Sequence, residues 1–475
     1  MRSEITIPTD VLCDIFHLLC HGPIALHDLK NKRHFCEFPW AAGQVCRHWR
    51  WAFLSHTRLW SSFALKPGAF SATYIAEMNR RATIYLERSG QRPLTIAVST
   101  LPGQADATFP KTVWEILLSR SKRWKKANLV LEERATLDGL LRCRGPMSTL
   151  ETLRIVFIPD YTAMEDFNAF EVAPRLTELH VVQHEYVKEI WHFPWAQLTK
   201  LKIESSSYYY GNDLWKVLFQ LENIEELHII TSIYSSPPSP DPLPIKCLPG
   251  LRLLETSFDF TPMFSWITAP LLEHLHLHRS NGHSFPDDSE AYERALASLI
   301  QRSSCQIHRL AFEECTAQEI RIVLDVLASI EELSITSHSG HLDIIRDITP
   351  GLDGCIYLPK LKVLQVACFT HVERIENDVT VFSRLLEAWG KELSLASWHD
   401  VVPLSKFVLR LGLPLGELNP KLDKVLEIVH GWPSFARVYI NGSRLTPSLR
   451  LPCNPDDGHC ENGRCEDSFL CLGHL

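Results

Sequence analysis

The sequence predicts an α/β protein in which a small N-terminal helical module precedes an α/β solenoid. Apolar residues recur at helical spacing near the start of the chain, and helix and strand patterns alternate from about residue 67 to residue 400. A short leucine-containing strand pattern also returns every 21 to 35 residues. A chain of 475 residues is too long for one compact core, so more than one domain is expected.

The first expected helix lies within ITIPTDVLCDIFHLLC. Its apolar residues recur at helical spacing, at Val11, Leu12, Ile15, Phe16, Leu18 and Leu19. Pro8 suits the first turn, and Asp10 is favourable near the positive end of the helix dipole. The segment therefore predicts one amphipathic helix.

A second helix is expected to begin near Pro39. Its apolar residues follow an i, i+3, i+4, i+7, i+11 stripe that we expect to be buried, at Ala42, Val45, Cys46, Trp49 and Phe53. The following stretch, SHTRLWSSFAL, predicts a short capped helix that leads into an extended segment. A module this small has too little core to be stable alone and often completes itself on a partner.

These N-terminal residues resemble the F-box family, whose pattern is a Leu-Pro start, an Ile-Phe pair, Val-Cys-Arg-x-Trp-Arg and a closing Leu-Trp. The residues that carry the resemblance are Ile7, Pro8, Val11, Leu12, Ile15, Phe16, Leu19, Val45, Cys46, Arg47, Trp49, Arg50, Leu54, Leu59 and Trp60. The segment between Leu19 and Val45 is longer than in the shortest members, and Asp10 stands where Glu is commoner. The alternative is a generic helical hairpin with a tryptophan-rich core.

The resemblance implies docking on the Skp-type adaptor of a cullin–RING ubiquitin ligase and, through it, on the cullin. Aromatic and apolar side chains in a dry centre carry most interface energy. The expected anchors are Ile7, Pro8, Leu12, Phe16 and Trp60, with Arg47 and Arg50 at the rim. Trp49 is expected to pack mainly between the two helices. The full set expected to bind the adaptor is Ile7, Pro8, Leu12, Ile15, Phe16, Leu19, Val45, Arg47, Trp49, Arg50, Leu59 and Trp60.

From residue 67 onward, helix and strand patterns alternate. YIAEMNRRATIYLERSG is helical and ends at Gly90, PLTIAVS alternates as a strand does, and VWEILLSRSKRW followed by NLVLEE repeats the pair. Similar strand segments then recur: LETLRI, LTELHV, LTKLKI, IEELHI, LRLLET, LEHLHL, IHRLAF, IEELSI and LKVLQV. Their second apolar anchors are Leu153, Leu179, Leu201, Leu227, Leu254, Leu275, Leu310, Leu333 and Leu364.

This body resembles a degenerate leucine-rich repeat, because the L-x-x-L-x-L strand is present while the usual Asn or Cys after it is mostly missing. Each unit has an apolar face that only stacking can bury. Insertions are expected at HRSNGHSFPDDSEAYERA and SGHLDIIRDITPGLDGC, and an exposed loop at SIYSSPPSPDPLP. The expected regions are the helical module at 1–66, the solenoid at 67–400, a C-terminal capping region at 401–452 and a flexible, cysteine-containing tail at 453–475.

Alternation along the strands predicts which side chains face away from the core. If Leu153 points inward, Arg154 points outward, and the corresponding positions form one column down the ladder. We expect a protein substrate to bind this column, because the strand face is the usual binding surface of leucine-rich-repeat proteins. Its proposed substrate-binding residues, several of them basic or histidine and suited to an acidic segment, are Arg154, His180, Lys202, His228, Glu255 and His276. The alternative is an ordinary solvated strand face.

Several other patterns are expected to be ordinary parts of the fold and not metal or nucleic-acid sites. His274, His276 and His278 alternate on one strand, where residues two apart are about 6.6 Å from one another along it, so exposed surface is expected and not a metal site. The basic run RSKRWKK is expected to be a solvated helix end before a strand rather than a nucleic-acid site. The tail cysteines Cys453, Cys460, Cys465 and Cys471 lack regular zinc spacing and are expected to be reduced thiols, with zinc as the alternative.

Composition limits the classes of function. The 48 Lys and Arg against 56 Asp and Glu, with a net charge of -8, argue against a protein whose main partner is nucleic acid. The apolar runs are too short for a membrane span, no signal peptide is evident, and scattered cysteines fit a reducing compartment, so a cytoplasmic or nuclear protein is expected. P-loop, dinucleotide-binding, zinc-protease and nucleophile-elbow motifs are missing.

The sequence therefore predicts a non-catalytic substrate receptor of a Skp–cullin–F-box ubiquitin ligase, without a cofactor or a metal. Its expected partners are the Skp-type adaptor, the cullin held through it and an unknown protein substrate. Two alternatives remain: a scaffold or regulator that acts without ubiquitylation, and an enzyme of unknown type, which would need a pocket with converging polar groups.

Overall fold

A computed structural model describes most of the chain. The described residues are 7–19, 24–25, 42–66, 71–99, 110–131, 134–142, 145–157, 167–183, 192–209, 211–233, 244–258, 262–279, 289–327, 329–337, 348, 358–369, 380–387, 404–412, 436–440 and 443–445. The proline-containing loop and the second expected insertion lie mainly outside these ranges, and so does half of the first insertion. The cysteine-containing tail lies wholly outside them. The chain divides into two compact units, Met1–Leu251 and Arg252–Leu475.

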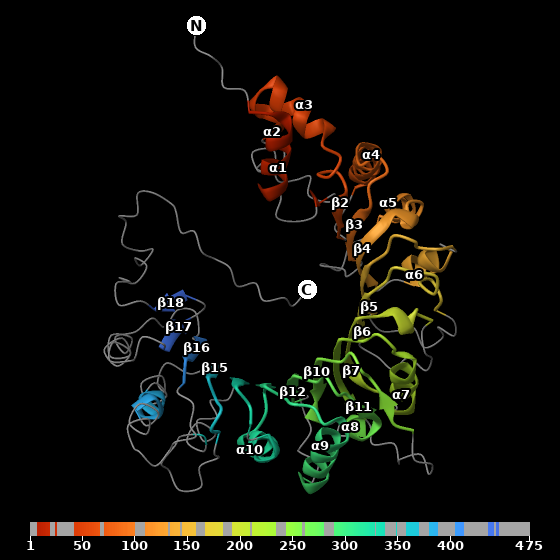
Figure 1. Cartoon of the computed structure of the whole chain (residues 1–475). Coiled ribbons are helices and arrows are strands. Elements are labelled where there is room, and N and C mark those ends of the chain that lie inside the picture. The colour runs from red at the N-terminus through yellow and green to blue at the C-terminus, as the bar shows by residue number, and fades with distance from the viewer. Residues whose placement is uncertain are drawn as a thin grey trace. The chain divides into compact units, whose positions relative to one another are not determined.

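The first unit begins with three helices, α1 (Thr9–Leu19), α2 (Ala42–Val45) and α3 (Arg47–Ser55), labelled in Figure 1. Phe16 of α1 packs against α3, with ring centroids 5.4 Å from Trp49 and 6.4 Å from Phe53. These edge-on aromatic contacts join the two helices, as apolar spacing in each helix predicts.

The prediction of one helix running through the second apolar stripe is wrong at Cys46. This residue has extended dihedral angles, φ −158° and ψ 175°, and its Sγ accepts a hydrogen bond from the backbone N–H of Trp49 at 3.4 Å. It therefore ends α2 and caps α3 instead of continuing a helix. The interruption breaks the expected stripe: Cys46 is exposed and Val45 is 60% exposed, whereas Phe53 is buried.

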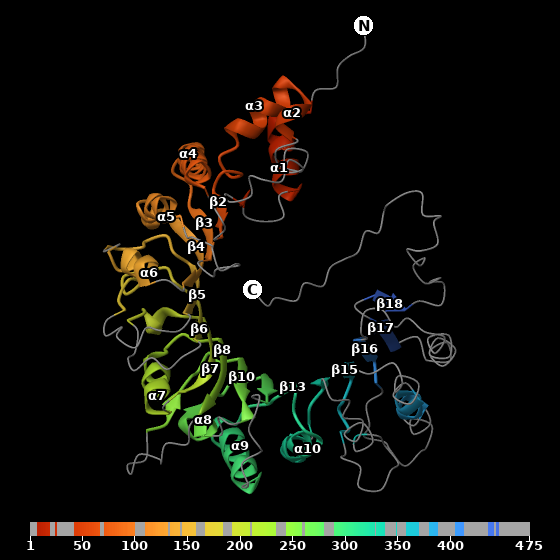
Figure 2. The same cartoon turned by 180° about the vertical axis from the view of Figure 1, so that it is seen from behind.

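Eight of the strands described in the first unit pair in parallel, in sequence order. They are β1 (Ile24–Ala25), β2 (Ser62–Leu65), β3 (Leu94–Ser99), β4 (Trp124–Leu131), β5 (Thr152–Phe157), β6 (Glu178–Gln183), β7 (Lys200–Tyr209) and β8 (Glu226–Ile233). The longer helices of the unit are α4 (Ala72–Arg88), α5 (Lys111–Leu118), α6 (Arg134–Leu141) and α7 (Gly211–Gln220). Figures 1 and 2 both show these helices on one side of the strands.

In the second unit, seven of the described strands pair in parallel and the last one is antiparallel. They are β10 (Leu253–Ser257), β12 (His274–His278), β13 (Arg309–Glu313), β14 (Glu332–Ser337), β15 (Val363–Phe369), β16 (Lys406–Gly412), β17 (Ala436–Ile440) and the antiparallel β18 (Ser443–Leu445). The labelled helices are α8 (Pro262–Trp266), α9 (Ser289–Ser303) and α10 (Ala317–Val326), and residues 380–387 are also helical. The two-residue strands are β9 (Lys246–Cys247), which belongs to the first unit, and β11 (Ile267–Thr268).

The α/β class with a large parallel sheet is confirmed. All nine leucine anchors identified from the sequence, from Leu153 to Leu364, are at most 2% exposed. They also lie opposite one another: Leu153, Leu179, Leu201 and Leu227 are successive register partners in the first unit, and Leu254, Leu275, Leu310, Leu333 and Leu364 in the second. The apolar side of each strand thus builds the core.

Two further features bear on sequence expectations. The basic run from Arg120 to Lys126 forms a 3₁₀ turn, Ser121–Arg123, followed by β4, and Trp124 within it is buried. Arg123 donates hydrogen bonds to the carbonyl oxygen of Arg92 and to Ser89 Oγ, so its side chain is bound to the segment that follows α4. In the part of the chain that the structure describes, no helix has both the length and the apolar character that crossing a bilayer requires.

Candidate functional site

The column of outward side chains expected from the sequence exists as a row of neighbours in each unit. Arg154, His180, Lys202 and His228 are successive register partners across β5 to β8, and Asn128 of β4 precedes them. Their apolar neighbours along each strand are buried beneath the helices, so the row faces away from the helices. We call these five residues the first-unit row.

Carboxylates balance most of the charge of the first-unit row. Glu204, two residues after Lys202 on β7, lies 2.6 Å from Lys202 Nζ and 3.5 Å from His180 Nε2. His228 Nε2 lies 3.6 Å from Glu226. Hydrogen bonds from His180 and then from Lys202 outweigh burial and lower the pKa of Glu204 to about 2, so this carboxylate is ionised at neutral pH.

Arg154 differs from its neighbours in the row. Its Nη1 donates a hydrogen bond to the amide oxygen of Asn128 at 3.1 Å, and no ion pair between Arg154 and a carboxylate is found among the described residues. Burial lowers the pKa of the guanidinium, although it remains charged at neutral pH. Arg154 is therefore the member of the row best able to receive an anionic group. Sequence reasoning missed the balancing carboxylates because it followed one column and not the residues two places before or after it on each strand.

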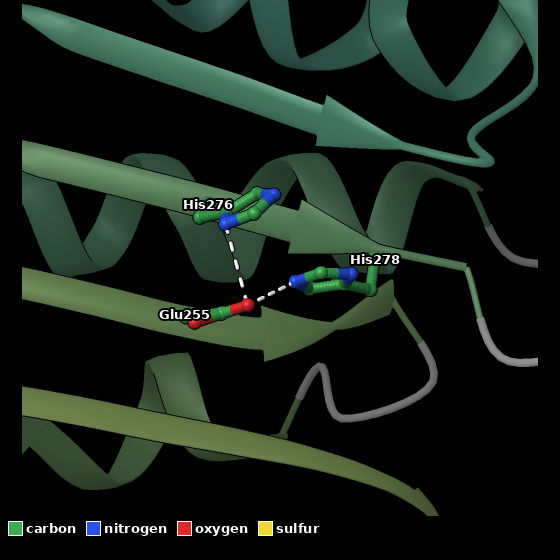
Figure 3. A group of neighbouring side chains, drawn as sticks. All are labelled: Glu255, His276 and His278. Carbon is green, nitrogen blue, oxygen red and sulfur yellow. Dashed lines mark hydrogen bonds and ion pairs between the residues drawn. The ribbon is translucent and has the colours of Figure 1, made fainter. Parts of the chain in front are cut away.

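In the second unit the column continues through Glu255 and His276, which are register partners, and then Ala311, Ser334 and Gln365. His278 and Glu313, also register partners, flank it. We call Glu255, His276, His278 and Glu313 the histidine–glutamate cluster. Figure 3 shows a carboxylate oxygen of Glu255 between nitrogens of the two imidazoles, on the side of the strands away from the helices.

The contacts within the histidine–glutamate cluster are short. His276 Nδ1 lies 3.3 Å from Glu255 Oε1, and His278 Nε2 forms a hydrogen bond with the same oxygen. The outer nitrogens face Glu313 Oε2, at 3.0 Å from His278 Nδ1 and 3.8 Å from His276 Nε2. Burial alone would lower the pKa of His278, but the hydrogen bonds to Glu255 and Glu313 more than offset it and raise the pKa to about 9.

The expectation that these histidines stand apart along the strand is wrong for His276 and His278. Their rings tilt together, with centroids 4.1 Å apart, less than the spacing along the strand. Glu255 approaches from the neighbouring strand, which a count along one strand does not include. His274 lies outside the cluster: it is partly exposed, and its Nε2 is 3.9 Å from Glu273.

The residues expected to bind an adaptor fall into two groups in the first unit. Pro8, Leu19, Val45, Arg47 and Arg50 are exposed, while Ile7, Ile15 and Trp49 are partly exposed. The other four are buried within the chain, at 0 to 3% exposure: Leu12, Phe16, Leu59 and Trp60.

The interpretation of Leu12, Phe16 and Trp60 as interface anchors is therefore corrected, most clearly for Trp60. Its ring centroid lies 5.0 Å from those of both Phe53 and Tyr85, and its Nε1–H donates to the carbonyl oxygen of Phe53 at 3.1 Å. Trp60 joins α3 to α4 and has no free surface. The sequence did not reveal this because Tyr85, its main cover, belongs to the next helix and lies outside the motif.

Comparisons with known proteins matched solved structures, one of which is a distant likeness. No family model matches the chain, and no curated protein matches it. A crystal structure of a Bacteroides fragilis protein, a structural genomics target, aligns with 72% of this chain and 79% of its own, at 11% sequence identity and a TM-score of 0.33. This similarity is too weak to indicate a shared fold.

Exposed apolar side chains gather on the N-terminal helices. Ten large hydrophobic residues stand out as exposed in the described part of the chain, and six of them lie between residues 11 and 54: Val11, Leu18, Leu19, Val45, Trp51 and Leu54. Val11 and Leu18 are seven residues apart on α1 and therefore share a helix face. Trp51 is 61% exposed on α3. We call these six residues the N-terminal apolar surface.

Proposed function

We propose that this protein is the substrate-recognition subunit of a Skp–cullin–F-box ubiquitin ligase. In this proposal, α1 to α3 bind a Skp-type adaptor, and the sheet face turned away from the helices binds a protein substrate. The observation that carries the proposal is the N-terminal apolar surface, in the same segment that resembles the F-box in sequence. The chain itself contributes proximity and orientation, while the conjugating enzyme supplies the chemistry.

The N-terminal apolar surface supports docking on energetic grounds. Six large apolar side chains at 38 to 72% exposure leave a substantial area in contact with water. Burial of apolar surface contributes about 25 cal/mol per Å², and a few aromatic anchors dominate most protein interfaces. Trp51 and Leu18 are the most exposed of the six, which makes them the strongest candidates for anchors. Arg47, also exposed on α3, suits the rim.

The substrate half of the proposal rests on the first-unit row. The row offers neutral and paired polar groups together with the one guanidinium of Arg154, which hydrogen bonds to Asn128. A segment with one carboxylate or phosphate at that position fits this arrangement better than a strongly acidic segment does. Glu204 and Glu226 would repel additional negative charge.

The adaptor contact is tested with the full chain and a Skp-type adaptor. Leu18→Glu combined with Trp51→Glu is expected to reduce adaptor co-purification by at least about tenfold, because two charges would enter a dry interface. Both side chains are exposed, so the variant is expected to fold. The matched control is Val172→Glu with Phe219→Glu, two exposed apolar residues elsewhere in the first unit, at 56% and 49% exposure.

Equal adaptor recovery with both double variants would contradict the proposed docking surface. Recovery of the cullin together with the adaptor distinguishes a ligase subunit from a scaffold that binds the adaptor alone. In the same preparations, Arg154→Ala is expected to lose bound substrate proteins that Leu18→Glu/Trp51→Glu retains. A substrate set unchanged by Arg154→Ala would contradict the assigned recognition face and leave the adaptor contact standing.

A further inference from the structure

The histidine–glutamate cluster brings potential metal ligands together from neighbouring strands. Glu255 on β10 and His276 on β12 are register partners. At the next outward position, His278 on β12 and Glu313 on β13 are register partners. Ala311, the partner of His276 on β13, has only a methyl side chain, which leaves room for the imidazoles above the sheet. The cluster therefore rests on the parallel pairing of three strands.

One ligand atom from each of Glu255, His276 and His278 lies within 4.8 Å of the others. Zinc binds histidine nitrogen and carboxylate oxygen at about 2.0–2.2 Å, so tetrahedral ligand atoms are about 3.4 Å apart. His276 Nδ1 is already 3.3 Å from Glu255 Oε1. The widest separation among the three atoms, at most 4.8 Å, therefore has to shorten by no more than about 1.4 Å to reach this spacing.

We propose that Glu255, His276 and His278 bind a divalent transition-metal ion of the zinc class, leaving a fourth position open to water or to a group of a bound partner. Two imidazoles with one carboxylate form a ligand set suited to zinc and its neighbours, and poorly suited to magnesium, which prefers an octahedron of oxygens. The cluster also lies on the side of the strands away from the helices (Figure 3), and the His276 side chain is 31% exposed.

Glu313 supplies an outer contact that a histidine metal site needs. Its Oε2 lies 3.0 Å from His278 Nδ1 and accepts a hydrogen bond there. A proton held on Nδ1 leaves the Nε2 lone pair of a neutral imidazole facing Glu255, which is the direction of the proposed ion. Carboxylates in this position orient ligating histidines and increase their basicity. Glu313 is thus a positioning residue in the proposal.

Electrostatics also favour a cation at this place. Glu255 and Glu313 bring two carboxylates against the two imidazoles, whose ring centroids are 4.1 Å apart. A dication bound there would balance both carboxylate charges and use both imidazoles as neutral ligands.

The test measures zinc and cobalt binding to the full chain. Wild-type protein is expected to bind one zinc ion that His276→Gln/His278→Gln does not bind, and to show the visible absorption of four-coordinate cobalt with nitrogen and oxygen ligands. His274→Gln is the matched control, because His274 lies on the same strand and face but two residues away from the cluster. This control is expected to bind the ion as the wild type does.

Zinc binding by two single variants distinguishes loss of a ligand from loss of the fold. His276→Gln alone changes a partly exposed side chain and is expected to fold, which circular dichroism checks, yet to lose zinc affinity by at least about 100-fold. Glu313→Gln is expected to weaken zinc binding by about 10–100-fold while leaving the cobalt ligand set unchanged. Thiolate-to-cobalt charge transfer would identify cysteines as the ligands.

Absence of zinc binding to wild-type protein would overturn the proposal. So would binding that survives His276→Gln/His278→Gln, a cobalt spectrum with only thiolate ligands, or equal losses in His274→Gln and His276→Gln. The proposal is independent of adaptor docking, since its ligands all lie in the second unit.

Discussion

Single residues decide how the outward side of the sheet presents its charge. From the sequence, the column of Arg154, His180 and Lys202 suggests a basic surface. The structure shows that Glu204 pairs with both His180 and Lys202, which leaves Arg154 as the exception. The spacing Lys202-x-Glu204 was visible in the sequence, but the contact of Glu204 with His180 crosses to another strand and requires the register.

Glu204 is expected to make stability dependent on pH in the acid range. Its pKa is lowered from 4.5 to about 2 by hydrogen bonds from His180 and Lys202, against the effect of burial. As the pH falls, Glu204 is therefore protonated in the unfolded chain at a higher pH than in the folded protein. Its contribution to the free energy of unfolding is complete above about pH 4.5 and is lost as the pH falls towards 2. After allowance for partial solvent exposure, this contribution is about 1–2 kcal/mol.

The measurement is the free energy of urea unfolding at several pH values. Glu204→Gln is expected to be less stable than wild type at pH 7 and to approach it near pH 2. Glu222→Gln, an exposed residue in the same unit, is the control and should run parallel to the wild type. Parallel curves for Glu204→Gln and the wild type would rule out this role of Glu204.

Local signals predict secondary-structure elements well where they agree with the surrounding fold. The strands that carry the leucine anchors lie where alternation places them, because one side of each strand is buried. The second helix is different: Cys46 lies in an apolar stripe that favours one helix, but its extended backbone and its Sγ contact with the N–H of Trp49 begin a new helix. Cysteine is not a usual N-cap, so sequence preference did not indicate this break.

Helix α10 offers a test of an element whose start is fixed by side chains. Thr316 Oγ1 accepts a hydrogen bond from the N–H of Glu319 at 3.2 Å, and Glu319 Oε2 accepts one from the N–H of Thr316 at 2.6 Å. This reciprocal pair is a capping box, which satisfies two backbone donors at the helix start. Thr316→Ala is expected to reduce the free energy of unfolding by about 1 kcal/mol.

The control for the cap is Thr316→Ser, which keeps the hydroxyl and should retain most of the stability. Amide hydrogen exchange within α10 provides a local readout, because loss of the cap should increase fraying at the N-terminal end of this helix. Equal stability of Thr316→Ala and Thr316→Ser would show that the hydroxyl contributes little.

At the scale of the whole molecule, sequence periodicity predicted the order of strands and their buried side more completely than it predicted sites. A column down the strands follows from the period within each strand. The histidine–glutamate cluster and the cover over Trp60 arise instead between elements, from Glu255 beside β12 and Tyr85 of α4. The sequence held all of these residues, but their meeting depends on register and on helix packing, which no single-strand pattern contains.

A cavity created by substitution in the core of one unit is expected to reduce the stability of the neighbouring strands before that of the rest of the chain. Leu201 of β7 is fully buried and lies opposite Leu179 and Leu227 in register. Leu201→Ala should cost about 2–5 kcal/mol, because it removes buried methyl groups and leaves a void. Where strands pair in sequence order, each one depends mainly on its two neighbours, so the loss should appear first in β6 and β8.

Amide hydrogen exchange of the full chain tests this expectation. Leu201→Ala should accelerate exchange in β6, β7 and β8 well before it affects β13 to β15, which belong to the second compact unit. Lys202→Ala is the matched control, since it changes the adjacent outward residue and leaves the core filled. A uniform acceleration across both units would show instead that the chain unfolds as one cooperative body, because a locally stabilised stack opens at the site of the cavity before it opens elsewhere.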